Sequence, residues 1–211
     1  MATVAYRLLG ISGSLRSQST NTAVLKALAT RLGDRATMSL FSLNDIPLYN
    51  ADLEADALPA SVTSLKEAIS QADGLIICSP EYNYGTSGVL KNALDWASRP
   101  GFNSPLKNKP VVIMTASPGV LGGVRAQAQL RETLSATLSR VVCGPQIVIP
   151  GVNQKIQDGR FVDETTIEFM LAAVDQIVAE IRILAHNRGK TKPDGFPLQT
   201  NDKVILPCAN P

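Results

Sequence analysis

Short apolar runs alternate along the chain with longer stretches in which apolar residues recur every three or four positions. The short runs predict β-strands, and two of them, residues 74–78 and 111–114, are apolar without alternation. Continuous apolarity is typical of strands that are covered on both faces, as in a parallel sheet. The predicted strands are residues 4–12, 37–41, 74–79, 111–117 and 141–143, the last with an extension at 146–149.

The longer stretches predict five amphipathic helices. In the last of them, apolar residues from Ile167 to Leu184 recur at steps of three and four, which places them on one helix face. The predicted helices are residues 20–32, 60–71, 89–98, 123–139 and 164–187. Strands and helices in alternation predict an α/β fold, a doubly wound five-stranded parallel sheet with helices on both faces. Right-handed crossovers then leave few topologies, and five strands favour the order 2-1-3-4-5.

Composition narrows the class of protein. The 211 residues are 45% hydrophobic and carry a net charge of +2, so the chain can bury one core and has no charge that favours nucleic acid. No apolar run reaches the roughly 18 residues that a membrane helix needs, and we expect a cytoplasmic protein without membrane contact. We predict one domain over residues 1–188. For residues 189–211 we predict an extended tail that packs on the domain or on a partner subunit, with disorder as the alternative.

Cysteine and histidine offer little chemistry. Cys78 and Cys143 end apolar runs, so both are predicted to be small core residues, and Cys208 lies in the tail. No Cys-x-x-Cys pair exists, which argues against zinc and dithiol chemistry, and no metal site is predicted. The single histidine, His186, closes a helical stretch without a partner for a ligand set or triad, so we expect a surface histidine.

Polar loops follow the first, third and fourth predicted strands. In a doubly wound sheet, ligands bind at the carboxyl ends of the strands where the strand order reverses, so these loops are expected to converge there. The first, residues 13–21, reads Gly-Ser-Leu-Arg-Ser-Gln-Ser-Thr-Asn before a helix. A helix N-terminus with hydroxyls and one arginine suits a phosphate. The alternative is that Ser19 or Thr20 only caps the helix, which explains one hydroxyl.

The other two loops suit a flat ligand. Residues 79–88 contain two tyrosines and an asparagine directly after a core strand, and such a loop can address a flavin ring through backbone N–H groups and an aromatic face. Residues 115–123 are glycine-rich, which permits close backbone approach to a flat ring. The alternatives are a turn whose tyrosines pack on a neighbour and a flexible connector.

Several catalytic patterns are missing from the sequence. No Gly-x-Ser-x-Gly elbow occurs, no carboxylate pair follows the strands, and no histidine is placed to act as a general base. The first loop is also neither a dinucleotide fingerprint nor a P-loop. Hydride transfer through a bound flavin needs none of these groups, because the cofactor carries the reactive atom.

Four motifs in order resemble one known family. They are Gly-Ser-Leu-Arg at 13–16 with Ser19 and Asn21, Pro-Glu-Tyr-Asn-Tyr at 80–84, Leu-Lys-Asn-Ala-Leu-Asp-Trp at 90–96, and Gly-Gly-x-Arg-Ala-Gln at 122–127 with Leu-Arg at 130–131. Over residues 6–149 the chain resembles the NADPH-dependent FMN reductase family, which includes bacterial chromate, quinone and azo reductases of flavodoxin-like fold.

The resemblance implies a site and a reaction. Residues 14–21 are expected to hold the FMN phosphate, residues 81–84 to contact the isoalloxazine and ribityl groups, and Ser117 to lie beside the ring. NADPH or NADH and then a quinone, azo compound, chromate or free flavin would react in turn, in a ping-pong cycle. The residues expected to bind FMN, from the loops and the resemblance together, are Ser14, Leu15, Arg16, Ser17, Gln18, Ser19, Thr20, Asn21, Pro80, Glu81, Tyr82, Asn83, Tyr84, Ser117 and Gly119.

The resemblance also implies a homodimer or homotetramer, with Arg125 as an interface residue. Ser87 departs from the family, which usually has proline there, and this predicts a more mobile or differently shaped loop before the third helix. The alternative function is a flavodoxin-like electron carrier or regulatory partner with little NAD(P)H turnover. The net charge of +2 argues against a carrier, because flavodoxins are strongly acidic. A structural domain that has lost its ligand is the third possibility.

Overall fold

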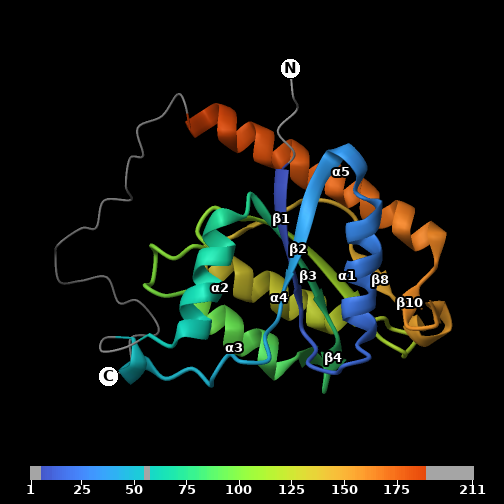
Figure 1. The fold of residues 1–211 in the computed structure, drawn as a ribbon, viewed down its shortest axis with the longest axis horizontal. Coiled ribbons are helices and arrows are strands. Elements are labelled where there is room, and N and C mark those ends of the chain that lie inside the picture. The colour runs from blue at the N-terminus through green and yellow to red at the C-terminus, as the bar shows by residue number, and fades with distance from the viewer. Residues whose placement is uncertain (1–5, 55–57, 189–211) are drawn as a thin grey trace.

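A parallel β-sheet forms the middle of the molecule in the computed structural model, which describes residues 6–54 and 58–188 (Figure 1). The sheet order is β2-β1-β3-β6-β7, and every neighbouring pair is parallel. This confirms the predicted order 2-1-3-4-5. The strands are β1 (Tyr6–Ser12), β2 (Ala36–Phe41), β3 (Gly74–Ser79), β6 (Pro110–Ala116) and β7 (Arg140–Val141).

The fifth position of the sheet is filled by two short strands rather than one. Both β7 and β8 (Ile147–Ile149) pair with β6, β7 near the start of that strand and β8 at its end. Between them the chain leaves the sheet, and Cys143 is exposed there, so the prediction of a core cysteine was wrong. The buried Gln127 side chain donates from Nε2 to Ile147 O at 2.7 Å and thereby holds β8 after the interruption.

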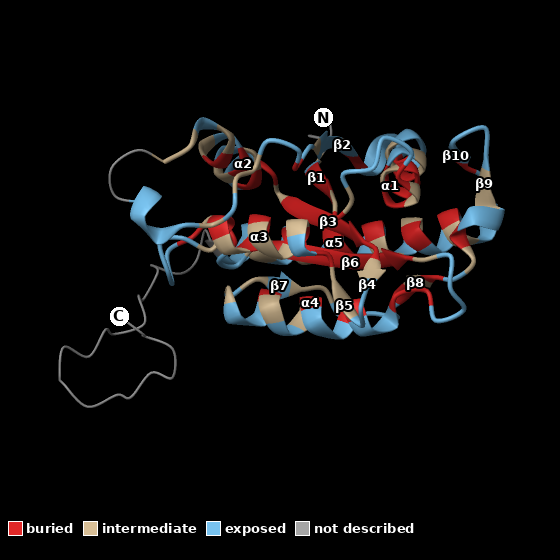
Figure 2. Ribbon diagram, turned by 90° about the horizontal axis from the view of Figure 1, so that it is seen from below, coloured by how far each residue is buried: buried red, intermediate tan, exposed pale blue. Residues whose placement is uncertain are grey.

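Five α-helices cover the sheet, two on one face and three on the other. Buried residues of α1 and α5 share one hydrophobic cluster, and those of α2, α3 and α4 share a second. Figure 2 shows that burial concentrates in the central strands and on the sheet-facing sides of the helices. The helices are α1 (Thr20–Arg31), α2 (Ala60–Gln71), α3 (Gly88–Ala97), α4 (Val124–Ala136) and α5 (Glu164–Arg188). Each lies within three residues of its predicted bounds at both ends.

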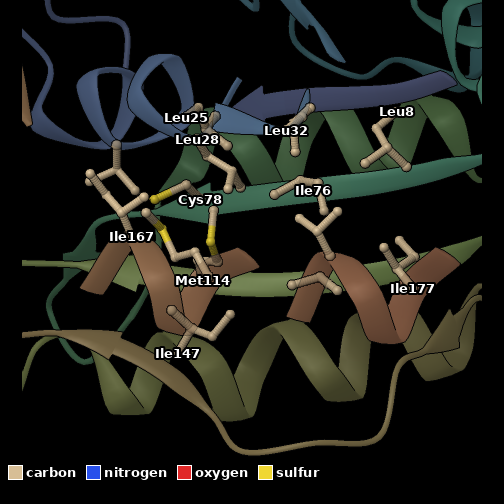
Figure 3. Packing of buried hydrophobic residues seen from close by; sticks show 14 of the residues in the cluster. Leu8, Leu25, Leu28, Leu32, Ile76, Cys78, Met114, Ile147, Ile167 and Ile177 are labelled. Atoms are coloured by element: carbon tan, nitrogen blue, oxygen red, sulfur yellow. The ribbon is translucent and has the colours of Figure 1, made fainter. Parts of the chain in front are cut away.

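The central strands supply both clusters because successive side chains point to opposite faces. In β3, Ile76 and Cys78 join the cluster under α1 and α5, whereas Leu75 and Ile77 join the other. Figure 3 shows the first cluster, with Ile76, Cys78 and Met114 facing the helices. Each such Leu or Ile side chain contributes about 1.5–3 kcal/mol on burial, so β3 contributes to both halves of the core.

Two small hairpins and three 3-10 turns interrupt the βα alternation. A strand of two residues carries no periodicity, so the pattern of apolar positions could not predict these hairpins. The hairpins are β4 (Glu81–Tyr82) with β5 (Gly85–Thr86) and β9 (Ile156–Gln157) with β10 (Arg160–Phe161); the turns are η1 (Gly33–Arg35), η2 (Ala51–Leu53) and η3 (Val152–Lys155).

The predicted tail, residues 189–211, lies outside the described residues, as do Val4, Ala5 and Cys208. His186 is exposed on α5, which confirms the surface histidine. Within residues 6–54 and 58–188, no helix combines the length and apolarity needed to cross a bilayer.

Helix α5 begins at a carboxylate with two partners. Asp163 accepts a hydrogen bond from the backbone N–H of Thr166 at 2.8 Å and forms an ion pair with Lys155. The Lys155 ammonium, with help from the Thr166 N–H, lowers the pKa of the Asp163 carboxyl below its usual 3.8. A carboxyl whose pKa is lowered on folding stabilises the fold above its unfolded pKa and loses that effect as the pH falls.

We therefore expect Asp163→Asn to be less stable than the natural chain by about 1 kcal/mol at pH 7. The difference should close as the pH falls below about 4, where the unfolded carboxyl takes up its proton. Urea unfolding between pH 3 and pH 7 measures it. A gap that is the same at pH 3 and at pH 7 would contradict the assigned role of the Lys155 ion pair.

Candidate functional site

The loops after β1 and β3 meet at the carboxyl edge of the sheet, the lower edge in Figure 1. Gly13 N–H donates to Cys78 O at 2.9 Å, which ties the first loop to the end of β3. A Cβ atom on Gly13 would lie 3.0 Å from Ser79 Oγ and 3.0 Å from Ser87 Oγ. Glycine is thus the residue that lets these two loops approach so closely.

The first loop presents free hydrogen-bond donors. Within the described part of the chain, the backbone N–H groups of Leu15, Ser17 and Gln18 donate no hydrogen bond. Arg16 is exposed without a carboxylate partner among those residues, and the first turn of α1 holds no acidic residue. Free N–H groups, a helix N-terminus and an unpaired guanidinium together suit a phosphate.

Ser19 and Asn21, in contrast, use their side chains inside the protein. Ser19 Oγ accepts from Thr22 N–H at 3.2 Å, so the predicted capping alternative is correct for this residue. Asn21 is 3% exposed; its Nδ2 donates to Ala116 O at 3.3 Å, and its Oδ1 accepts from the Cys78 thiol at 3.2 Å. Asn21 thus joins α1 to the ends of β3 and β6 through its side chain.

The loop after β3 is built on two buried serines. Ser79 Oγ donates to Pro80 O at 2.8 Å and lies 3.0 Å from Thr86 Oγ1, which closes the base of the β4–β5 hairpin. Ser87 is 2% exposed and caps α3, accepting from Leu90 N–H at 3.3 Å. The departure from the family's proline thus replaces a rigid residue with a helix cap at the same point.

The β4–β5 hairpin carries two exposed aromatic side chains. Tyr82 is 52% exposed and Tyr84 is 73% exposed, beside the exposed Asn83. Asn83 and Tyr84 have φ values of 50° and 66°, the left-handed conformation that a two-residue hairpin turn demands. Large exposed rings next to a polar loop are typical of a surface that contacts a ligand or another chain.

Glu81 is only partly exposed, and its carboxylate is engaged with α4. One carboxylate oxygen accepts hydrogen bonds from the backbone N–H groups of Arg125 at 2.8 Å and Ala126 at 3.1 Å. The Arg125 guanidinium lies 4.1 Å from the Tyr84 ring centroid, and Gln129 accepts from Thr86 N–H at 2.6 Å. Sequence reasoning did not find this link, because residues 81–86 and 125–129 come together only in three dimensions.

The loop after β6 is fixed by the end of β8. Ser117 N–H donates to Ile149 O at 3.1 Å, and Ser117 Oγ accepts from Gly119 N–H at 3.2 Å. Gly119 is exposed, but Gly122 and Gly123 are buried with φ values of 58° and 93°. A Cβ on Gly123 would lie 2.8 Å from Thr115 Cβ. These two glycines serve packing within the protein, which corrects their predicted approach to a flat ring.

The site lacks reactive side chains of its own. Burial raises the pKa of the Cys78 thiol far above its usual value of 9.0, so this cysteine stays protonated. Among residues 6–54 and 58–188, no group of three or more His, Cys, Asp or Glu residues could hold a metal ion. The free donors of the first loop make this arrangement suited to binding a phosphorylated ligand.

Comparison with known proteins identifies the cofactor of the family. Residues 6–154 match the family described as NADPH-dependent FMN reductase. The chain belongs to this family. Membership makes the protein an oxidoreductase that uses FMN and a reduced nicotinamide nucleotide.

Three relatives illustrate the family's range. An NAD(P)H-dependent FMN reductase of Pseudomonas aeruginosa is 38% identical over 179 residues, 84% of this chain and 96% of its own. A quinone reductase of Escherichia coli is 38% identical over 184 residues, 84% of this chain and 97% of its own. The solved structure of a flavoenzyme NAD(P)H:acceptor oxidoreductase from Paracoccus denitrificans superposes with a TM-score of 0.76 at 35% identity, over 85% of this chain and 98% of its own.

Proposed function

We propose that this FMN reductase family member binds FMN at the carboxyl edge of its sheet and reduces quinones there, with azo compounds, chromate and free flavin as further acceptors. The electrons come from NADPH or NADH. The observation that carries the proposal is the loop of residues 14–18, whose free N–H groups and unpaired Arg16 lie beside the α1 N-terminus. Such a set of donors without a nearby carboxylate favours a phosphate.

We assign contacts with the rest of the cofactor to the other two loops. Residues 81–84 present two aromatic rings and a turn at one side of the edge, and Ser117 with Gly119 lies at the end of β6. FMN held by these loops would supply the hydride and electron transfer chemistry between the nicotinamide and the acceptor. Because both substrates would need this one surface, we expect them to alternate in ping-pong fashion. The buried Asn21 contributes by holding the ends of β3 and β6 in register with α1.

We base the proposed breadth of acceptors on the described residues of the three loops. The exposed Tyr82 and Tyr84 offer a flat acceptor mainly apolar, non-specific contacts, which exclude few acceptors in favour of another. We further propose a homodimer or homotetramer, a cytoplasmic location, and a catalytic domain over residues 1–188 with residues 189–211 as an accessory tail.

The test is a panel of acceptors and both nicotinamides with FMN-loaded protein. Parallel double-reciprocal plots for NADPH against a quinone would support alternating substrates. Protein that retains no flavin absorbance after FMN is added and the unbound FMN is removed would overturn the proposed site. A flavin-loaded sample that oxidises neither NADPH nor NADH would favour the electron carrier instead.

A further inference from the structure

The β4–β5 hairpin is too small to hold its own shape. Each strand has two residues, and the turn contains two non-glycine residues with positive φ. Isolated two-stranded hairpins are marginal in water even when they are longer. The hairpin also carries the exposed Tyr82 and Tyr84, whose placement therefore depends on contacts outside it.

Helix α4 supplies those contacts at three points of the hairpin, and Arg125 Nη1 also lies 3.8 Å from the Glu81 carboxylate. The Glu81 carboxylate accepts from Arg125 N–H at 2.8 Å and Ala126 N–H at 3.1 Å, which secures the first strand of the hairpin. Gln129 Oε1 accepts from Thr86 N–H at 2.6 Å, which secures the second strand. The Arg125 guanidinium covers the Tyr84 ring at 4.1 Å, which secures the turn.

The link through Glu81 differs from the other two because its carboxylate also caps the N-terminus of α4. The residue before the helix is Gly123, which has no side chain to cap the first N–H groups. The Glu81 carboxylate takes that place from a distant part of the sequence, and its negative charge favours the positive end of the helix. Its side chain is 12% exposed, so water competes little for the same bonds.

We propose that Glu81 is a positioning residue for the electron acceptor. By capping α4 it fixes the hairpin against the helix, so that Tyr82 and Tyr84 form a firm wall for a flat acceptor ring such as a quinone. The proposal rests on the proposed function, since it assumes that acceptors bind at this edge. The plain alternative is that Glu81 stabilises α4 and has no influence on the acceptor.

The experiment compares Glu81→Ala and Glu81→Gln with Glu180→Ala. Glu180 is a matched control, because its carboxylate also links a helix to another element, through Arg140 at 2.7 Å, and lies away from the hairpin. With FMN-loaded protein, we expect Glu81→Ala to lower kcat/KM for a quinone about ten- to hundredfold, mainly through KM. Glu81→Gln keeps an acceptor oxygen and should recover part of the loss, and Glu180→Ala should leave KM unchanged.

Amide hydrogen exchange gives a readout that does not depend on turnover. In Glu81→Ala, exchange should accelerate at residues 82–86, and in Glu180→Ala it should stay at the natural rate there. If the two alanine variants lose thermal stability alike while quinone KM and exchange of the hairpin stay unchanged, the positioning role is overturned. A natural chain without any turnover would instead contradict the proposed function. Hydrogen exchange would still report in that case whether Glu81 holds the hairpin, so the two failures can be told apart.

Discussion

Replacing Asn21 by Asp is expected to lower the free energy of unfolding by about 3–5 kcal/mol at pH 8. The side chain is 3% exposed, and the new carboxylate oxygen would face Ala116 O where Nδ2 now donates at 3.3 Å. A buried charge beside a carbonyl oxygen has no compensating partner there. The Cys78 thiol donates to the other oxygen and offsets only a small part of this cost.

The pH dependence of this variant has a definite sign. Burial raises the pKa of such a carboxyl in the folded state above its unfolded value of about 3.9, so the folded chain binds more protons over that range. Stability must then fall as the pH rises, by at most about 1.4 kcal/mol per pH unit, and recover on acidification. The protonated acid can also donate to Ala116 O as the amide does.

Urea unfolding of the variant at pH 5 and pH 8 measures the effect. Asn83→Asp is the matched control, since Asn83 is exposed in the hairpin turn and tolerates aspartate in its left-handed conformation. Equal losses at pH 5 and pH 8 would show that Asn21 is not the buried junction described above.

Replacing Arg16 by Ala is expected to weaken FMN binding by about 1.5–3 kcal/mol, a rise in the dissociation constant of roughly ten- to over a hundredfold. Arg16 has no carboxylate partner among the described residues, so its guanidinium is free to make a charged hydrogen bond with a phosphate. Because the side chain is exposed and makes no hydrogen bond or ion pair with residues 6–54 and 58–188, thermal stability of the apoprotein should be unchanged.

Fluorescence titration with FMN and with riboflavin measures the two contributions. Riboflavin lacks the phosphate, so its affinity should be the same in Arg16→Ala and in the natural chain. Lys26→Ala removes another exposed cation of α1, farther from the helix N-terminus, and should leave both affinities unchanged. An unaltered FMN dissociation constant in Arg16→Ala would show that backbone N–H groups and hydroxyls hold the phosphate without the guanidinium.

The local pattern of apolar residues was sufficient to predict the bounds of an element where its burial is uniform. The continuous apolar run of β3 and the periodic apolar face of α5 were predicted within one residue at each end. Strand β3 is covered by helices on both faces, and α5 packs on the sheet with one face, so each has a uniform pattern of burial. Strand order followed from right-handed crossovers together with the number of strands. The fifth strand was predicted only in part, since Gln127 from α4 replaces strand pairing where β7 ends, and no local pattern contains that substitution.

The candidate site, too, was predicted from the sequence only in part. Residues 13–21 indicated a phosphate loop from sequence, because helix N-termini, hydroxyls and an arginine act through neighbours in the chain. The sequence could not show that Asn21 would turn inward to Ala116, nor that Glu81 would cap a helix 44 residues later. In both cases a polar group must satisfy its hydrogen bonds when buried, and the available partner is set by packing.

The sequence by itself thus determined the doubly wound sheet, its strand order and the family, because hydrophobic periodicity, chain handedness and short motifs are local properties. Only the tertiary structure decided which polar side chains of the loops stay free for a ligand and which are used to join the loops. That choice depends on distances between segments far apart in the chain. It leaves Arg16 open to solvent and commits Asn21 and Glu81 to the interior of the site.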